Sequence, residues 1–368
     1  MNKTKTSNLL RSIAFFLTAV VLCCTFGFTV DGWIPSNLAN ECVYADNSSL
    51  YYSDAFQPDN SSTNEENESL DSSEKIYVNP FTGEKTESIS STKGSYAFVF
   101  DSCSALYGIE KADVLIEMPI ENGSSRYVAI STDYDDLWKI GSIAPTRGYI
   151  SNIAKYFCAT LLSNGTDDQV SYNSCDITDK HFDFSINSSY CYTEQEKHVY
   201  TNCQLVSSAV TMLTPYDNSD KVPFTFAEEN QIASGEITAK SIMIPTAEAF
   251  KTQLIYNSTS CKYSIIKNGE ICKDFLSTKT LDFTNCFVLF ADSTTYDNSS
   301  CNQMIMETIG SGKGFYITNG TATEIKWVGT IEGNLSFFTE DGSELIVNPG
   351  RSYISFLGTS KIDNIEFS

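Results

Sequence analysis

Two glutamates and two arginines in the first half of the chain are residue types from which an acid–base site could be built. Glu117 and Glu121 flank a short segment that follows a predicted strand. Arg126 opens the next strand, Arg147 follows, and the chain has only four arginines in all. Two carboxylates can act as general acid and general base when their surroundings separate their pKa values. The same side chains can instead form an ion-pair network that holds one hairpin, and we favour that interpretation.

His198 is the second candidate for chemistry, since a histidine can act as a general base or as a metal ligand. His181 is the only other histidine, so a histidine-rich metal site cannot be built. The acidic stretch 133–136 lacks the glycine and the distal glutamate of an EF-hand loop, which favours a solvated loop over a calcium site. No G-x-S-x-G motif marks a serine nucleophile, and no feature selects one cysteine for a Cys–His pair. We therefore expect no metal and no cofactor, and we assign no catalytic residue.

The glycine-rich stretch 307–320, which contains Lys313, has the composition of a phosphate-binding loop. A P-loop needs G-x-x-x-x-G-K-[ST], but Glu307 stands where its first glycine should be and a glycine follows the lysine. A dinucleotide-binding loop leads into a helix, whereas a strand and an Asn-Gly turn at 319–320 are predicted here. The stretch therefore indicates a flexible entry to a β-hairpin, where glycine allows a close backbone approach or a bulge.

Aromatic residues are the third feature with a possible function, because the chain contains 20 tyrosines, 23 phenylalanines and 3 tryptophans. Exposed tyrosines and tryptophans on a sheet suit glycan or peptide binding through stacking and apolar contact. Most of the aromatic residues must instead form the core of the sheet, which leaves a few for binding.

The elements that position these residues begin with three short strands of β-branched and aromatic residues. They are predicted at 96–101, 112–118 and 126–131. Apolar residues at helical spacing then predict a helix of about four turns between Pro145 and Asn164. A second helix is predicted at 203–213. Strands that lead into helices indicate a mixed α/β N-terminal domain over 77–215.

The pattern changes after a connector at 216–235. Successive short strands follow, and Asn-Gly or Asp-Gly pairs between them can supply the positive φ angles of tight hairpin turns. These pairs are Asn268-Gly269, Asn319-Gly320 and Asp341-Gly342. We therefore predict an antiparallel, β-rich C-terminal domain over 236–368, and the fold class of the whole chain is predicted to be α+β.

The N-terminal segment 1–45 has the pattern of a targeting sequence. Lysines and an arginine precede an apolar run, 12–30, that no charge interrupts. Such a run is typical of a signal peptide or of a signal anchor, and its positive end should stay in the cytoplasm. Small residues before Asp46 allow cleavage, while the length of the run favours a retained anchor, so both alternatives stay open. Either way, we expect export to the outer face of the cell membrane or beyond it.

Charge excludes some partners. The chain has 46 acidic against 24 basic residues, a net charge of −22, which argues against nucleic acid and against docking on anionic lipid head groups.

Residues 46–76 hold eight acidic residues and one lysine among many Ser and Asn, and so little apolar surface predicts a disordered tether. The nine cysteines beyond residue 45 are an odd number, and their disulfide pairing stays open.

Several ordered motifs occur along the chain. The stretch 79–83 spells NPFTG, and the strand that follows ends in Asp101. Next come GIEKADVLIEMPIENGSSR from Gly108 to Arg126, IGSIAPTRGYISNIA over 140–154, and KHVYT around His198. With these motifs the chain resembles the YerB-like lipoprotein family of Gram-positive bacteria, whose activity is not established. Segments 312–327 and 338–354 are similar to the β-rich C-terminal end of that family.

The resemblance implies a polar network at the matched positions. Its members are Asp101, Glu117, Glu121, Arg126, Arg147 and His198. Two features depart from the family pattern, since Ala144 replaces its first arginine and Leu22 with Cys23 does not form a lipobox. The chain is therefore identified as a divergent member of the family.

Two functional hypotheses follow. The first is an exported envelope protein that binds cell-wall material or another envelope protein without catalysis. The second is a hydrolase or transferase that acts on the wall, with Glu117 or Glu121 and His198 as acid–base groups. We favour the first, because no nucleophile or metal motif is complete.

Overall fold

The computed structural model describes most of the chain beyond the predicted tether. The described residues are 77–86, 94–166, 178–194, 198–216, 222–230, 235–246, 251–296 and 303–368. All of them belong to one unit, Ser72–Ser368. The predicted targeting segment (1–45) and tether (46–76) lie outside the described residues, as does part of the predicted connector. Among the described residues, no helix has the length and apolar character needed to cross a membrane.

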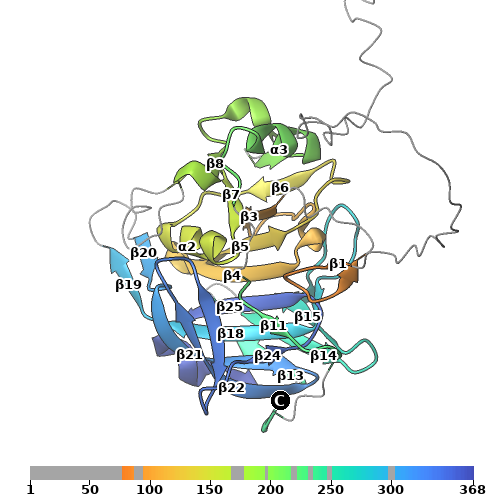
Figure 1. The fold of residues 1–368 in the computed structure, drawn as a ribbon, viewed down its shortest axis with the longest axis vertical. Coiled ribbons are helices and arrows are strands. Elements are labelled where there is room, and N and C mark those ends of the chain that lie inside the picture. Colours follow the sequence, from red (N-terminus) through yellow and green to blue (C-terminus); the bar gives the residue numbers. More distant parts are fainter. Residues whose placement is uncertain are drawn as a thin grey trace, which may run out of the picture. The chain divides into compact units, whose positions relative to one another are not determined.

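A large mixed sheet forms the framework of the described residues (Figure 1). Its strands lie in the order β12 (Ile237–Thr238), β22 (Thr321–Gly329), β21 (Gly310–Thr318), β18 (Asn285–Ala291), β25 (Ser352–Gly358), β4 (Val114–Ile120), β5 (Ser124–Ser131), β3 (Ser95–Asp101), β6 (Ile140–Ile143), β10 (Val199–Thr201) and β9 (Tyr192–Thr193). β23 (Leu335–Thr339) pairs with β22, and β7 (Ala159–Ser163) pairs with β3 and with β8 (His181–Asp183).

Strand β25 lies within this sheet and joins its N-terminal strands to its C-terminal strands. It comes late in the chain, yet it lies between β18 and β4 and runs parallel to both of them. The sequence had indicated purely antiparallel C-terminal strands, and that prediction is wrong for β25. Strands from both sides of the predicted connector share one continuous ladder of hydrogen bonds, and the domain boundary at 216–235 stays a prediction.

The predicted α+β class, with a mixed α/β N-terminal domain, is wrong: the described residues are β-rich throughout. Their α-helices are short, α2 (Gly148–Tyr156) and α3 (Cys203–Val210). The helix predicted to reach Asn164 ends at Tyr156, Cys158 takes a φ of 46°, and β7 follows in parallel with β3. Because every residue of β7 is buried, its apolar run has no alternation that would distinguish a strand from a continuing helix.

Both faces of the large sheet are buried. Along β3, Ala97 and Val99 pack into one core cluster, while Tyr96, Phe98 and Phe100 pack into the other. Helix α2 covers the first face. Helix α3 and a second sheet cover the second face. This burial on both sides explains why the central strands are nearly continuous apolar runs.

The remaining elements are small. The second sheet contains β16 (Glu270–Ile271), β15 (Lys262–Lys267), β14 (Thr252–Asn257), β13 (Ser241–Ile244), β26 (Glu366–Phe367) and β17 (Asp282–Phe283). Two-stranded pairs are β1 (Tyr77–Val78) with β2 (Lys85–Thr86), β11 (Thr225–Phe226) with β24 (Ile346–Val347), and β19 (Ser293–Tyr296) with β20 (Gln303–Met306). The 3-10 turns are η3 (Ile109–Lys111), η4 (Glu121–Gly123), η5 (Thr178–Lys180), η6 (Ser188–Tyr190) and η8 (Thr359–Asn364).

The glycine-rich stretch forms a β-hairpin, which confirms that part of the prediction. β21 and β22 are joined at Asn319 and Gly320, whose φ angles are 50° and 79°. The glycines lie inside β21 rather than in a flexible entry to it. Gly312 faces Trp327 across the hairpin, and the Trp327 indole N–H donates to the Phe290 carbonyl at 3.0 Å. A glycine is needed there because the indole crosses directly over the strand.

Replacing Gly312 with alanine should destabilise the fold by roughly 1–3 kcal/mol, the usual cost of forcing an extra carbon into a packed site. The added Cβ would lie 2.2 Å from the Phe290 carbonyl oxygen and 2.6 Å from Trp327 Nε1. Urea unfolding measures the change. Ser311→Ala, at the exposed neighbouring position, is the control and should change stability by at most about 0.5 kcal/mol. Equal unfolding midpoints for the two variants would contradict the packing argument.

Candidate functional site

The turn that follows β3 brings several of the predicted site residues together. Asp101 and Arg126 face each other on β3 and β5, and Arg126 Nη1 donates to Asp101 Oδ1 at 3.2 Å. Ser102 Oγ lies 2.8 Å from Ser125 Oγ, which in turn donates to Glu117 at 2.8 Å. Asp101, Arg126 and Glu117 are thereby linked through Ser125 and its neighbours, and Asp101 with Arg126 forms the first of two ion pairs within the predicted network.

Glu121 and Arg147 form the second of these ion pairs. Glu121 opens η4, the turn between β4 and β5, and Arg147 is the residue that precedes helix α2. The guanidinium contacts both carboxylate oxygens, Nη2 reaching Oε1 and Nε lying 3.2 Å from Oε2. Burial alone would raise the pKa of Glu121, but the hydrogen bonds from Arg147 and the backbone outweigh it and lower that pKa. This pair ties the hairpin turn to the helix start.

Glu117 lies apart from that pair, in the interior. Its side chain has no exposed surface, and each carboxylate oxygen accepts two hydrogen bonds. The donors are Ser125 Oγ (2.8 Å), Lys267 Nζ (2.7 Å), Thr252 Oγ1 (3.0 Å) and Tyr353 OH (2.5 Å). Lys267 comes from β15 of the second sheet and also lies 4.3 Å above the centre of the Tyr127 ring. Glu117 thus fastens four elements together and leaves no oxygen for a substrate.

His198 is placed next to two serines. Its Nδ1 lies 3.0 Å from Ser142 Oγ and 3.4 Å from Ser104 Oγ, and Ser142 is buried. No hydrogen bond or ion pair described for the chain joins this histidine to Glu117 or Glu121. The acid–base role that the sequence suggested for these residues stays a prediction. His181, the other histidine, contacts Ser163 at 2.8 Å, and burial lowers its pKa although nearby Asp183 opposes the shift.

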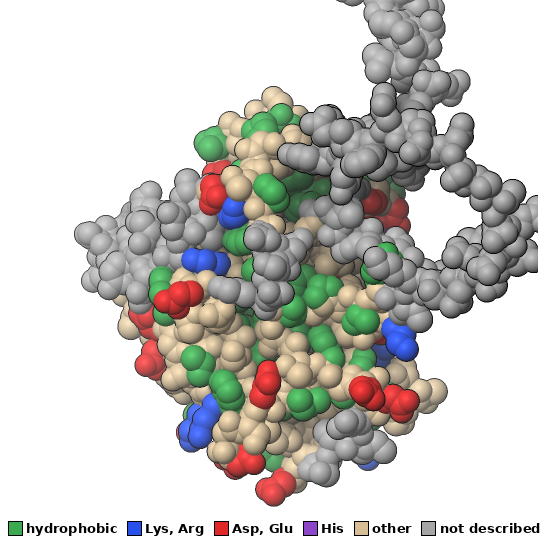
Figure 2. All heavy atoms as spheres, in the orientation of Figure 1, with side chains coloured by type: hydrophobic (Ala, Val, Ile, Leu, Met, Phe, Trp, Pro, Cys, Tyr) green, Lys and Arg blue, Asp and Glu red, His purple; other side chains and the backbone are tan. Residues whose placement is uncertain are grey.

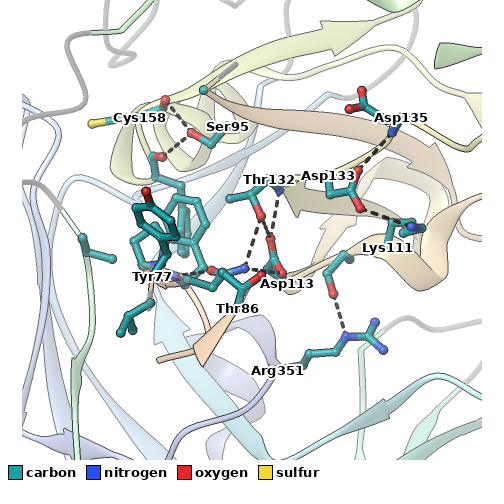
Figure 3. Close-up of a pocket in the computed structure, with 18 of the residues that line it drawn as sticks. Tyr77, Thr86, Ser95, Lys111, Asp113, Thr132, Asp133, Asp135, Cys158 and Arg351 are labelled. Carbon is teal, nitrogen blue, oxygen red and sulfur yellow. Dashed lines mark hydrogen bonds and ion pairs between the residues drawn. The ribbon is translucent and has the colours of Figure 1, made fainter. Parts of the chain in front are cut away.

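A cavity that the sequence analysis did not single out lies at the opposite end of these strands, where β3 begins and β5 ends (Figure 3). Its volume is about 680 Å³. On its wall, Asp113 before β4 and Thr132 after β5 turn their side chains toward each other (Figure 3), and Asn79 of the NPFTG stretch donates hydrogen bonds to both. The sequence signals for it were the motif around Asn79, the motif that contains Asp113 and the acidic stretch 133–136, and none of them by itself shows that these residues meet. We call this space the Asp113 cavity.

The carboxylate of Asp113 is held by neutral donors. Asn79 Nδ2 donates to Oδ1 at 3.0 Å, and the backbone N–H and the hydroxyl of Thr132 donate to Oδ2 at 2.9 and 2.8 Å. No lysine or arginine among the described residues forms an ion pair with it. Burial raises the pKa of Asp113, against the hydrogen bonds from Thr132 and the more distant charge of Arg351. A partly buried carboxylate with a raised pKa at a cavity wall marks a candidate binding group.

Of the other charged groups of the Asp113 cavity, Lys111 and Glu110 form ion pairs, whereas the buried Nη2 of Arg351 has no hydrogen-bond partner among the described residues. Lys111 pairs with Asp133 at 3.3 Å and with Asp136 at 2.8 Å. Arg351 Nε donates to the Ala112 carbonyl at 2.7 Å. Glu110 pairs with Lys279 at 3.0 Å. Tyr77, Phe81 and Phe157 add aromatic surface, so the cavity combines an apolar wall with an acidic one.

The described surface agrees with the strongly acidic composition. On the face drawn in Figure 2, lysine and arginine side chains lie apart from one another rather than in a patch. Within the described ranges, no three His, Cys, Asp or Glu side chains gather as metal ligands. The seven cysteines in those ranges are free thiols: Cys103, Cys158, Cys191, Cys203, Cys261, Cys272 and Cys286. Burial raises the pKa of Cys272 to about 11, which opposes thiolate formation.

Replacing Lys267 with methionine should cost about 3–5 kcal/mol of stability, because it leaves the buried Glu117 carboxylate without a counter-charge. Glu117→Gln should cost a similar amount, and the double variant less than the sum of the two. Lys279→Met is the matched control, since Lys279 is 72% exposed in its pair with Glu110 and should matter by at most about 1 kcal/mol. Denaturant unfolding at neutral pH measures all four. A Lys267→Met variant as stable as the control would contradict this role.

The Glu121–Arg147 pair predicts a pH dependence. Because the folded-state pKa of Glu121 is lowered, its stabilising contribution is complete above the unfolded pKa and disappears as pH falls through the folded value. The stability difference between the native chain and Glu121→Gln should therefore shrink as pH falls from about 6 to about 3. Urea midpoints across that range measure it. A difference that stays constant over the range would show that the carboxylate charge contributes nothing.

The chain is similar in fold to one solved structure, that of the YerB protein from Bacillus subtilis. The TM-score is 0.66, the identity is 18%, and the match covers 79% of this chain and 99% of that one. At that identity the similarity concerns the fold alone. No curated protein matches the chain.

The family match covers most of the described residues. The N-terminal domain of a protein family of unknown function, DUF3048, matches residues 81–214, and the C-terminal domain of the same family matches residues 242–354. The two matches follow each other in the family's order and include the Glu117 network, as well as Asp113 and Thr132 of the cavity but not Asn79. The chain therefore belongs to the DUF3048 family, as a divergent, YerB-like member.

Proposed function

We propose that this protein is a non-catalytic binding module of the cell envelope and that the Asp113 cavity holds an amine-bearing part of its ligand. The observation that carries the proposal is the Asp113 carboxylate, which lies on the wall of the cavity with three neutral hydrogen bonds and no ion pair. A protonated amine would supply the missing positive charge. Charge-assisted hydrogen bonds of this kind are stronger than neutral ones.

The rest of the lining supports the same ligand class. The charged residues that line the cavity are four acidic ones, Glu110, Asp113, Asp133 and Asp135, and two basic ones, Lys111 and Arg351. An excess of acidic groups favours a cationic ligand over a phosphate or a nucleotide. Cell-wall peptides can carry free amino groups, which suits the expected export of the chain.

The alternative, a wall hydrolase or transferase, has less support. It needs a carboxylate that can reach a substrate, but Glu117 is fully enclosed and both of its oxygens are saturated. Glu121 is held by Arg147 at both oxygens, which favours its charged form and suits it poorly to donate a proton. We therefore assign these residues to the structure and not to chemistry.

The proposal is tested by retention on purified cell-wall sacculi. The full chain, kept in mild detergent, is passed over sacculi whose free amino groups are either intact or acetylated. Retention should be strong on the intact wall and lost on the acetylated one, since acetylation removes the charge that Asp113 would pair with. This comparison alters only the ligand, so it does not depend on how any variant folds.

A matched pair of variants locates the binding group. Asp113→Asn should lower the affinity for intact sacculi about tenfold or more, the effect of losing one charged hydrogen bond. Asp341→Asn removes the same charge from an exposed turn away from the cavity and should leave the affinity unchanged. Equal retention on intact and acetylated wall, or equal losses in the two variants, would overturn the proposal.

A further inference from the structure

A second cavity adjoins the Asp113 cavity. Its volume is about 470 Å³, and it is lined mainly by carbon-rich side chains, among them Tyr96, Tyr134, Leu213 and Tyr216. Tyr96 and Tyr134 stand edge to face with their ring centres 4.7 Å apart. None of the residues that line it is charged. We call it the tyrosine cavity.

The two cavities meet over the ends of two strands. Gly94, Ser95 and Cys158 line both of them. Ser95 begins β3 and pairs with Ala159, which begins β7. The shared rim therefore lies at the N-terminal ends of these two parallel strands. The Asp113 cavity is lined by Phe81 and Phe157 of one core cluster, and the tyrosine cavity by Tyr96 and Tyr134 of the other. The cavities therefore lie on opposite faces of the sheet and join around these strand ends.

The rim leaves room for a connecting chain of atoms. At Gly94, a Cβ would meet no atom of the described residues within 4 Å. The Ser95 hydroxyl is turned away, donating to the carbonyls of Phe157 (3.1 Å) and Cys158 (2.8 Å). With this hydroxyl satisfied, the Ser95 side chain does not oppose the passage of an apolar group.

We infer that the ligand is an amphiphile, with a protonated amine at Asp113 and an apolar arm that crosses the rim into the tyrosine cavity. This inference rests on the proposed function, because it extends the ligand of the Asp113 cavity. Apolar carbon buried between the tyrosines adds affinity without any further charge. A short cationic ligand would fill one cavity only, and an amphiphile fills both.

The test titrates the full chain with n-alkylammonium ions from methylammonium to octylammonium. Affinity should rise about fourfold for each methylene that enters the tyrosine cavity, the equivalent of about 0.8 kcal/mol per buried methylene, and then level off. Thr211→Trp places an indole at an exposed position that lines this cavity, and it should abolish the rise while methylammonium binding persists. Met212→Trp is the matched control, since Met212 is exposed on the same turn and does not line the cavity.

A second measurement uses the native chain only. Cys158 lies half-buried at the shared rim, while Cys103 is exposed elsewhere. Octylammonium should slow alkylation of Cys158 and leave that of Cys103 unchanged, and methylammonium should slow neither.

The outcomes separate the two ideas. If methylammonium binds but chain length adds nothing, or adds equally in Thr211→Trp, the amphiphile is excluded and the amine site stands. If no ammonium ion binds, the proposed function fails and the inference fails with it.

Discussion

The buried Glu117 carboxylate is the contact on which the arrangement of the fold depends. It receives hydrogen bonds from β5, from β14 and β15 of the second sheet, and from β25, so one side chain fixes four elements. A buried carboxylate is costly unless each of its lone pairs accepts a hydrogen bond. This requirement restricts which arrangement of the surrounding elements is stable. In the register that β25 takes between β18 and β4, Tyr353 reaches this carboxylate.

The two cavities follow from the way the sheet is covered. Helix α2 and the NPFTG stretch lie against one face, and α3 with the segment after it lies against the other. Neither covering reaches around the strand ends at Ser95 and Ala159, so a space remains on each side of the same edge. Asp113, just before β4, then becomes a charged group at the border between a packed core and an open space.

Local pattern predicted the strands and the second helix well, as α3 (Cys203–Val210) shows, but it predicted the extent of the first helix poorly. The three N-terminal strands and the hairpin at Asn319-Gly320 are present, because β-branched runs and an Asn-Gly pair determine conformation over a few residues. The long helix was wrong after Tyr156, since β7 is buried on both faces and shows no alternation. That burial depends on β3 and β8, which no local pattern reveals.

The sequence by itself determined the family, the acidic character and the identity of the polar residues, because these depend on composition and ordered motifs. Only the tertiary structure decided how those residues are distributed. It separated Glu117 from Glu121, gave Glu117 to Lys267, paired Arg126 with Asp101, and exposed Asp113 to a cavity. The physical reason is that partners such as Glu117 and Lys267 lie far apart in the chain, and the packing of the second sheet, which contains β15, against the large sheet, which contains β4, brings them together.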